Sequence, residues 1–544
     1  MRARVLFRAA IAAALASSCG SQGLTSGTAS AASPGTSGRF RDVSAGLPEP
    51  ARVVYVSPSG GGNGATAQAP AKLQRAVDGS KPGDEIRLLA GDYEGKIRVS
   101  SGGTAEHPVV IRNNPGDAVR LKGWIHVDDG VPSVWIAGLD ISPAAGSDRG
   151  DVCVQMQGAD VRVINNYIHD CAHNGIAAWR PNRSAAPGQL VYGNVIARSD
   201  HGLYAQNDYE EDGYKRFVRN LVLDSQTGCK KNCFSFHGYT EHGSNSGLWV
   251  EESVFRGARF LIGGTNSRTR HTVMKGNVFQ SAAPQIAYTS PSQHDDVSRN
   301  VVYGSALTVG FWATDGPSRF TENELMNADA EINDLRPVGA GEAPAAVKDA
   351  GGKSHTTAPE KGKPQAARFH PQDVIDGNVY LAPDGGSIRS TWWFPGGRQS
   401  CCKEKTLADL RSDLQASGCN RCEANGRTIA APVSPRVFLW GNAYEKGRVE
   451  LAIYRSADPG AAGAAAVPVD LSPVLEAGSG YSVVRAADGP ASTAVASGTY
   501  AGGTVPVPVT GEFEAFLVLP GAAGAGATAG SAPAGGTPAA TPTP

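Results

Sequence analysis

Short apolar runs alternate with polar bends over most of this chain. From about residue 108, an Asn-x-apolar motif recurs between pairs of such runs, and the separations of successive copies are 28, 26, 32, 25, 23 and 23 residues. The copies stand at Asn166, Asn194, Asn220, Asn277, Asn300 and Asn323, with Glu252 where a further Asn is expected. No sustained i, i+3, i+4, i+7 apolar spacing accompanies them, which disfavours helical repeats. The pattern predicts an all-β chain in which each period forms one coil of a parallel β-helix solenoid.

The Asn positions have a structural interpretation. A bend between strands needs a residue that tolerates the left-handed backbone region, and Asn does so more readily than most other residues. Coils stack about 4.8 Å apart, so equivalent Asn side chains can hydrogen-bond from one coil to the next. We therefore expect Asn194, Asn220, Asn277 and Asn300 to share one column, and we assign them no catalytic role.

The pattern changes at both ends of the repeat. The stretch AKLQRAV, from Ala71 to Val77, has helical spacing and predicts a cap over the first coil. Strand-like runs with hairpin signals follow the repeat and predict a small C-terminal antiparallel β-sandwich. The expected domains are a signal peptide at 1–18, a disordered tether at 19–48, the β-helix at 49–395 with a mobile insertion at 336–370, a Cys-rich excursion with a short surface helix at 396–432, the sandwich at 433–520 and a disordered tail at 521–544.

Charge and the N-terminus restrict the partners and the compartment. The 544 residues carry 50 Lys and Arg against 51 Asp and Glu, so nothing favours a nucleic acid partner. Residues 1–18 resemble an export signal, and ASSCGS resembles a bacterial lipoprotein cleavage site that would lipidate Cys19. A cut after Ala31 is the soluble-export alternative. We expect an extracytoplasmic monomer, either secreted or held at the cell surface, that meets a membrane only through an N-terminal lipid.

Export makes disulfides the leading interpretation of the other cysteines. Eight candidates remain, and the sequence does not pair them: Cys153, Cys171, Cys229, Cys233, Cys401, Cys402, Cys419 and Cys422. Zinc is an alternative at CKKNCFSFHGYTEH, where Cys229, Cys233, His237 and His242 have C-x3-C-x3-H-x4-H spacing. The gap between the Cys and His pairs is shorter than in zinc fingers, so the disulfide is preferred.

The run GDEIRLLAGDYEGKIRVSSGGTAEHPVVIRNNPG, followed by the Asn-marked coils, resembles the right-handed parallel β-helix proteins of the pectate-lyase superfamily. These include exported bacterial polysaccharide lyases. The final strands, with NAYEKGRVELAIY, resemble a tail found on such proteins. The resemblance covers roughly residues 52–335 and implies a right-handed solenoid that binds an acidic polysaccharide along an outer groove. No catalytic signature of one family is present, so the resemblance assigns no catalytic residue.

The chemistry of a lyase restricts which residues can be catalytic. We expect these residues in the loops that follow the second strand of each coil. The substrate carboxylate must be neutralised before a base removes the C5 proton of a uronate, and an acid then protonates the leaving oxygen. We expect His237 or His242 as the base, Tyr239 as the acid, and Arg180 or Arg268 on the carboxylate. The expected substrate-binding residues are Trp179, Asn207, Tyr209, Lys230, Lys231, Asn266 and Arg270.

Other residues in these loops have competing interpretations. Asp208, Glu210 and Glu211 offer oxygen ligands suited to calcium, although a solvated acidic loop is the preferred interpretation and no cofactor is required. His173 and His201 occupy the same offset from Asn166 and Asn194, and a turn-packing pair is preferred to a catalytic pair. A hydrolase would use two carboxylates from among Asp208, Glu210, Glu211, Asp295 and Asp296.

The function expected from the sequence is therefore a polysaccharide lyase. A hydrolase and a uronate epimerase on the same scaffold are alternatives, because hydrolysis could use the same groove and epimerisation begins with the same proton abstraction. A non-catalytic solenoid that binds glycan or displays loops is a third alternative, because its coils would carry the same repeat.

Overall fold

The computed structural model describes only part of the chain, and every described residue belongs to the compact unit Arg39–Pro544. The described residues are 43, 45–146, 152–179, 188–207, 214–225, 233–240, 245–264, 269–287, 292–305, 307–311, 317–326, 333–337, 347–348, 354–355, 370, 372–383, 387–393, 399–400, 404–416, 418–455 and 465–521. The expected signal peptide, Cys19 and nearly all of the tail lie outside them.

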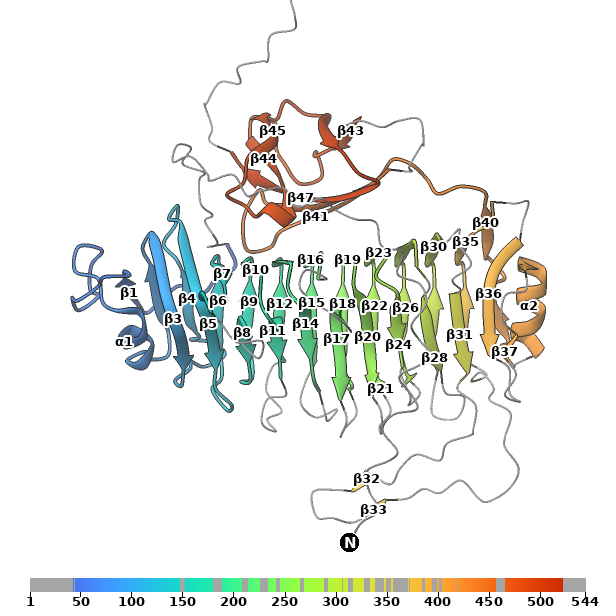
Figure 1. The fold of residues 1–544 in the computed structure, drawn as a ribbon, viewed down its shortest axis with the longest axis horizontal. Helices are drawn as coiled ribbons and strands as arrows, with labels where there is room; N and C mark the ends of the chain where they lie inside the picture. The colour runs from blue at the N-terminus through green and yellow to red at the C-terminus, as the bar shows by residue number, and fades with distance from the viewer. Residues whose placement is uncertain are drawn as a thin grey trace, which may run out of the picture. The chain divides into compact units, whose positions relative to one another are not determined.

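The repeat forms a parallel β-helix, as predicted. Figure 1 shows the coils side by side, with helix α1 (Leu73–Asp78) at one end and α2 (Leu407–Ala416) at the other. Each coil between the two ends contributes one strand to each of three parallel sheets. The first sheet, in order, contains β1 (Arg52–Val56), β2 (Asp84–Leu88), β4 (Val109–Asn113), β6 (Val134–Ala137), β9 (Arg162–Ile164), β12 (Leu190–Tyr192), β15 (Lys215–Val218), β18 (Leu248–Glu251), β22 (Val273–Lys275), β26 (Asp296–Ser298), β29 (Arg319–Thr321), β34 (Val374–Asp376) and β39 (Arg421–Cys422).

The second and third sheets begin together, because β3 (Gly91–Val99) pairs with β5 (Val119–Val127), and β5 then pairs with the first strand of each sheet. The second sheet continues with β7 (Asp140–Ser142), β10 (Tyr167–His169), β13 (Val195–Ala197), β16 (Leu221–Leu223), β19 (Val254–Arg256), β23 (Val278–Gln280), β27 (Val301–Tyr303), β30 (Glu324–Met326), β35 (Val379–Leu381) and β40 (Arg427–Ile429). The third continues with β8 (Val154–Met156), β11 (Asn174–Ala178), β14 (His201–Ala205), β17 (Phe234–Thr240), β20 (Arg259–Gly264), β24 (Pro284–Ile286), β28 (Thr308–Phe311), β31 (Asn333–Pro337) and β36 (Ser387–Trp393).

Short strands lie beside these sheets. Strands β21 (Thr269–Arg270) and β25 (Ser292–Gln293) pair at the edge of the third sheet, and β32 (Val347–Lys348) and β33 (Ser354–His355) pair within the segment expected as an insertion. Strands β37 (Gln399–Ser400) and β38 (Glu404–Thr406) run antiparallel to β36. The solenoid extends beyond the expected boundary at residue 395, because β39 and β40 add a further pair of strands to the first two sheets.

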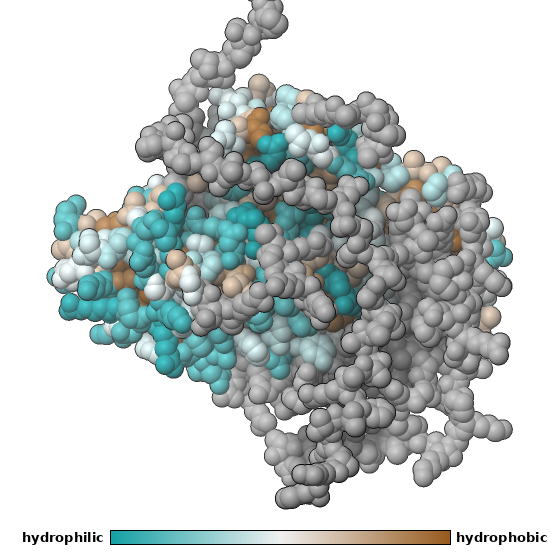
Figure 2. Space-filling model, in the orientation of Figure 1, coloured by the Kyte–Doolittle hydropathy of each residue, from teal (hydrophilic) through white to brown (hydrophobic). Residues whose placement is uncertain are grey.

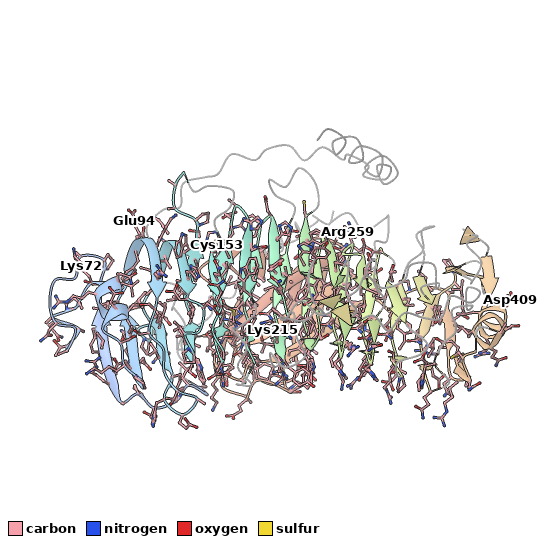
Figure 3. The ribbon with its side chains drawn as sticks, turned by 90° about the horizontal axis from the view of Figure 1, so that it is seen from below. Lys72, Glu94, Cys153, Lys215, Arg259 and Asp409 are labelled. Atoms are coloured by element: carbon pink, nitrogen blue, oxygen red, sulfur yellow. A yellow bond between two sulfur atoms is a disulfide. The ribbon has the colours of Figure 1, made fainter. Side chains whose placement is uncertain are left out.

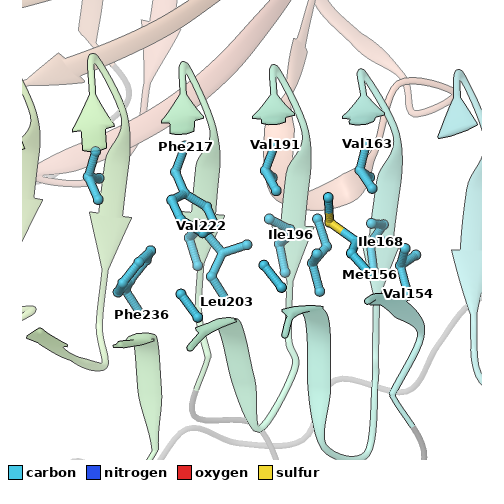
Figure 4. Packing of buried hydrophobic residues seen from close by; sticks show 14 of the residues in the cluster. Val154, Met156, Val163, Ile168, Val191, Ile196, Leu203, Phe217, Val222 and Phe236 are labelled. Carbon is cyan, nitrogen blue, oxygen red and sulfur yellow. The ribbon is translucent and has the colours of Figure 1, made fainter. Parts of the chain in front are cut away.

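Apolar side chains fill the interior between the three sheets. Figure 4 shows this packing with Val163, Val191 and Phe217 from the first sheet, Ile168, Ile196 and Val222 from the second, and Val154, Met156, Leu203 and Phe236 from the third. The two helices cover the ends of this interior. Leu410 and Leu414 of α2 are fully buried, so α2 is a cap and not the surface helix expected from the sequence. The visible face of the first coils is mostly hydrophilic (Figure 2).

The predicted Asn column lies at the bend between the first and second sheets. In this Asn ladder, each side-chain oxygen accepts a hydrogen bond from the backbone N–H of the equivalent residue one coil earlier. For example, Asn194 Oδ1 accepts from Asn166 N at 2.9 Å, and Asn300 Oδ1 accepts from Asn277 N at 3.1 Å. The side-chain amide also donates to the next coil, and Asn378 extends the ladder to Glu423.

Two details of this ladder differ from the sequence interpretation. The left-handed residue is the one before the Asn, as at Arg219 (φ 55°) and Arg299 (φ 56°), so the Asn itself serves as the hydrogen-bonding residue. Glu252 occupies the left-handed position (φ 48°), and Ser253 takes the place of the missing Asn. Ser253 Oγ accepts from Asn220 N at 3.0 Å, and its own N–H reaches Asn277 Oδ1.

A second ladder lies where the chain enters the first sheet. Asp295 Oδ1 accepts from Thr272 N at 3.1 Å, and Asp373 Oδ1 accepts from Ser318 N at 2.7 Å. Burial raises the pKa of Asp295 to about 7 and that of Asp373 to about 6. Asp295 is therefore a buried structural group, which removes it from the carboxylates available to a hydrolase.

The C-terminal strands form the predicted antiparallel sandwich. Its five-stranded sheet contains β41 (Arg436–Gly441), β42 (Val449–Tyr454), β47 (Phe513–Pro520), β44 (Gly480–Arg485) and β45 (Ala494–Thr499), and β43 (Ala465–Asp470) pairs with β46 (Thr504–Val509). A short 3-10 turn, η2 (Ala486–Asp488), follows β44.

The sandwich covers the outer face of the second solenoid sheet. Val195, Leu221 and Val254 of the solenoid share one buried cluster with Leu517 and Phe513 of the sandwich. The fully buried Arg448 forms ion pairs with Glu445 and Glu450 and donates to the carbonyl of Gly193 in the solenoid. The second sheet therefore has no free outer face over these coils.

The N-terminal segment covers part of the first sheet. Val43 is fully buried, its carbonyl accepts from Arg112 Nη1 at 3.2 Å, and Leu47 packs on the same cluster. The expected tether to residue 48 is thus too long, because the chain packs against the solenoid from Val43. Neither the sandwich nor the N-terminal segment shares one of these two buried clusters with the third sheet.

The Asn ladder is expected to contribute directly to stability. Replacing Asn300 with Ala leaves the buried backbone N–H of Asn277 without its acceptor, which costs about 1–3 kcal/mol. Chemical denaturation should therefore show an unfolding free energy lower by at least that amount.

The exposed Asn63→Ala is the matched control, because the Asn63 side chain only accepts from the backbone N–H of Ala65 in a surface turn. Its change should stay within about 0.5 kcal/mol. Equal effects of the two substitutions would contradict the role of the ladder.

The raised pKa of Asp295 predicts a pH-dependent stability. The folded protein binds this proton more tightly than the unfolded chain, so the contribution is fully present below the ordinary pKa of 3.8 and is lost as the pH rises through about 7. Asp295→Asn should therefore raise the unfolding temperature more at pH 8 than at pH 5, while Asp129→Asn, at an exposed position, should change neither value. A larger gain at pH 5 would contradict this assignment.

Candidate functional site

The outer face of the third sheet carries a cluster of aromatic and histidine side chains. The strand register aligns Tyr204 of β14 with His237 of β17, and aligns His201 with Phe234. The His237 ring stacks on Phe234 at a centroid distance of 4.1 Å and an angle of 9°, and lies 5.5 Å from the His201 ring. We call His173, Trp179, His201, Tyr204, Phe234, His237, Tyr239 and Arg259 the third-sheet cluster.

Period-2 alternation explains the outward positions of Tyr204, His237 and Arg259. Leu203, Phe236 and Phe260 point into the solenoid, so the neighbouring residue in each strand points to the opposite face. The strand is irregular between Phe234 and Phe236, so alternation does not account for Phe234 or for its register partner His201. Because the coils stack in register, outward residues of successive coils become neighbours although they lie about 30 residues apart in the sequence. Trp179 extends the cluster at one end, with its ring 5.0 Å from that of Tyr204.

Arg259 supplies a positive charge to this face. It is an exposed residue of β20, and its guanidinium carbon lies 5.4 Å from the centroid of Phe234, on the ring that stacks with His237 (Figure 3 labels Arg259). Arg180 and Arg268, the residues expected to bind the substrate carboxylate, lie outside the described residues. Arg259 was missed because its place beside His237 depends on the pairing of β17 with β20.

Both histidines at the centre of the cluster are neutral at ordinary pH. Burial, together with smaller effects of His201, Arg259 and His173, lowers the pKa of His237 to about 3. Burial, with a smaller effect of His173, lowers the pKa of His201 to about 4. Both imidazoles can therefore accept a proton, and an anion bound beside them would raise both pKa values.

Two buried nitrogen atoms of the cluster have no hydrogen-bond partner among the described residues. They are Nε1 of Trp179 and Nδ1 of His201. An unpaired buried polar group costs about 1–3 kcal/mol, so most such groups in proteins are paired. Hydroxyl and carboxylate oxygens are the groups that would pair with these nitrogens.

The structure brings some of the sequence-predicted residues together. His237 and Tyr239 lie two residues apart on one strand with their rings 5.4 Å apart, and Trp179 joins them through Tyr204. Arg270 is a half-buried residue of β21 with its register partner at Gln293. The other predicted site residues lie outside the described residues, namely Arg180, Asp208, Tyr209, Glu210, Glu211, Lys230, Lys231, His242, Asn266 and Arg268.

Asn207 does not belong to the outer face. It is fully buried, its Nδ2 donates to the carbonyl of Ser246, and its backbone N–H donates to Asn245 Oδ1. These contacts make Asn207 a bridge between coils, so its prediction as a substrate-binding residue is wrong for this conformation. Its position after an apolar strand suggested exposure, whereas the neighbouring coil encloses it.

His173 and His201 lie on successive coils, as their common offset suggested. Their rings are 5.4 Å apart, and the backbone N–H of His201 donates to the carbonyl of His173 at 2.9 Å. His201 also stacks on Phe234 of the next coil. The two histidines therefore pack against each other, and both belong to the third-sheet cluster.

The cysteines partly follow the disulfide interpretation. Cys153 is bonded to Cys171, and Cys419 to Cys422. Cys233 is also disulfide-bonded, which rules out its thiolate as a zinc ligand in this state. Cys229, Cys401 and Cys402 lie outside the described residues. No group of three or more metal-ligating side chains occurs in the described part of the chain, and no helix there is long and apolar enough to span a membrane.

Comparisons with known proteins bear on the fold. No family model and no curated protein matches the chain. Solved structures with similarity include pectate lyase Pel9A (14% identity, TM-score 0.35, 53% of this chain and 76% of that one) and a mannuronic acid-specific family 6 polysaccharide lyase from human gut microbiota (15%, 0.33, 61% and 81%). The Dettilon tailspike protein is also similar (12%, 0.35, 85% and 93%). The resemblance to β-helix proteins stands at the level of fold, and at such values it assigns no activity.

The electrostatics of the cluster can be tested by titration. Arg259→Met removes a positive charge that lowers the pKa of His237, so that pKa should rise from about 3. Nuclear magnetic resonance of the imidazole signals measures this directly.

Arg319→Met is the control, because Arg319 is an exposed residue of the first sheet and should leave the His237 titration unchanged. If both variants shift the pKa equally, or if neither does, the placement of Arg259 beside His237 is wrong.

Proposed function

We propose that the third-sheet cluster binds a uronate-containing polysaccharide and cleaves it by β-elimination. The observation that carries this proposal is the continuous outward face formed by Trp179, Tyr204, His237 and Tyr239, with Arg259 beside it. Aromatic rings pack against the apolar faces of sugar rings. The coils repeat about every 4.8 Å, so neighbouring sugars of one chain can meet neighbouring coils.

Each chemical role matches one side chain of the cluster. The guanidinium of Arg259 pairs with the uronate carboxylate and stabilises the charge that develops when the C5 proton leaves. Neutral His237 accepts that proton, and the electron pair of the C5–H bond forms the C4–C5 double bond. The C4–O4 bond then breaks, and the phenol of Tyr239 donates a proton to the departing oxygen.

The low pKa of His237 is compatible with this role only when substrate is bound. An imidazole with a pKa of about 3 is a weak base, and efficient bases have a pKa near the working pH. A substrate carboxylate beside the ring favours the protonated form and raises the pKa. Binding of the acidic substrate would thus activate the base.

Glycan binding without cleavage is the second candidate function. The observation that favours it is the same low pKa of His237 and His201, because neutral imidazoles and aromatic rings suit sugar binding without any proton transfer. Both functions need the same face, and they differ in the product.

The test is incubation of the purified protein with alginate, pectate, chondroitin and heparan. Unsaturated products, followed by ultraviolet absorbance, are expected, and His237→Gln and Tyr239→Phe should each lower kcat by about 100-fold or more. Arg319→Met, on the first sheet, should leave the rate unchanged.

The other outcomes decide between the candidates. New reducing ends without unsaturation would indicate a hydrolase and overturn the elimination. Binding in an affinity gel with no product would favour the second candidate. Unsaturated products formed equally fast by His237→Gln would remove His237 as the base, and absence of both binding and product would contradict both candidates.

A further inference from the structure

A pair of aromatic side chains, one exposed and one half-buried, lies on a different face of the solenoid. Tyr214 directly precedes β15, and Trp249 lies in β18 of the first sheet, with the two rings 4.8 Å apart at an angle of 40°. Tyr214 is 49% exposed, which is high for a large apolar side chain in the described part of the chain. Apolar side chains that adjoin one another at a surface, unlike single scattered ones, mark interaction sites.

The first sheet places a hydrogen-bond donor and a hydrogen-bond acceptor beside this aromatic pair. Arg216 is in register with Trp249, and its guanidinium carbon lies 5.6 Å from the centroid of the Trp249 ring. Arg216 Nη2 also lies 2.9 Å from Glu251 Oε2, although the Arg216 side chain remains 49% exposed. The ion pair and the ring hold the guanidinium in place without burying it.

Neither the N-terminal segment nor the sandwich shares a buried cluster with this patch. The buried cluster under the N-terminal segment includes Trp135, Ile164 and Val218 and does not reach Trp249. The sandwich packs on the second sheet, in a cluster that contains neither Tyr214 nor Trp249. Tyr214 and Arg216, each 49% exposed, remain accessible to solvent on the described surface.

The chemistry of the patch matches a sugar ring. A pyranose has an apolar face of C–H groups, which packs on aromatic rings, and a rim of hydroxyls that both donate and accept hydrogen bonds. Tyr214 and Trp249 provide the rings, Arg216 the donors and Glu251 the acceptor. A peptide docking surface would instead bury a wider apolar area than two tilted rings provide.

We propose that Tyr214, Trp249, Arg216 and Glu251 form a second glycan-binding site, which takes one pyranose ring of a polysaccharide chain and performs no chemistry. It lies on the first sheet, whereas the third-sheet cluster lies on another face. Two sites on one rigid solenoid allow a long chain to be held at both, which strengthens binding of polymers over short oligosaccharides.

The test compares long and short glycans with Trp249→Ala. Affinity electrophoresis in gels that contain each polysaccharide should show about tenfold weaker binding of polymer, whereas binding of short oligosaccharides at the third sheet should not change. Tyr214→Ser, at an exposed position, should weaken polymer binding to the same extent. It replaces Trp249→Ala in the test if that variant does not fold.

Trp124→Ala is the matched control, because Trp124 is also half-buried on a strand and has Lys96 5.4 Å from its ring centroid. It should leave polymer binding unchanged. Equal effects of Trp249→Ala and Trp124→Ala, or no effect of either, would overturn the proposal. A change in self-association, measured by sedimentation, without a change in glycan binding would also overturn it in favour of a protein interface.

The result of this binding test can be distinguished from the result of the test of the proposed function. If His237→Gln abolishes turnover while Trp249→Ala leaves polymer binding unchanged, the second site is wrong and the proposed function stands. If no polysaccharide is cleaved but Trp249→Ala weakens polymer binding, the second site stands without the lyase activity.

Discussion

The hydrogen bond from a backbone N–H to the side-chain oxygen of the next coil is the interaction on which this structure depends. It repeats from Asn166 to Asn378, with Ser253 as the one substitute, and holds each bend at the same place in the coil. Strands that leave a fixed bend pair in a fixed register. That register determines which side chains fill the interior and which become neighbours outside. The position of His237 beside Tyr204 and His201 of the preceding coil is thus a consequence of the ladder.

The three outer faces have different surroundings. The sandwich covers the second sheet with a buried apolar cluster, and Arg448 links it to the carbonyl of Gly193. The segment from Val43 covers the beginning of the first sheet. Polar and aromatic groups that could meet a polymer are therefore found on the third sheet and on the uncovered part of the first. In this account the sandwich contributes to function by occupying one face of the solenoid.

The sequence predicted the fold because its signal is periodic, whereas the site depends on pairing between coils. The recurrence of Asn194, Asn220, Asn277 and Asn300 was sufficient to predict one column and a parallel β-helix. Glu252 was expected in the Asn column, whereas Ser253 occupies that place. The chemistry of a side chain does not show which of two adjacent residues adopts the left-handed backbone conformation. His237 and Tyr239 were predicted from their chemistry, whereas Arg259 was missed and Asn207 was misplaced. Both errors concern contacts with residues on other coils, and the sequence of one strand does not specify such contacts.

The central claim is that register on the third sheet creates a glycan-binding face. A crystal structure with a bound uronate oligosaccharide tests it most directly. The account predicts sugar rings across Tyr204 and His237, with a carboxylate within hydrogen-bond distance of Arg259. An oligosaccharide bound only at another face, with the third-sheet cluster left empty at saturating ligand, would contradict it.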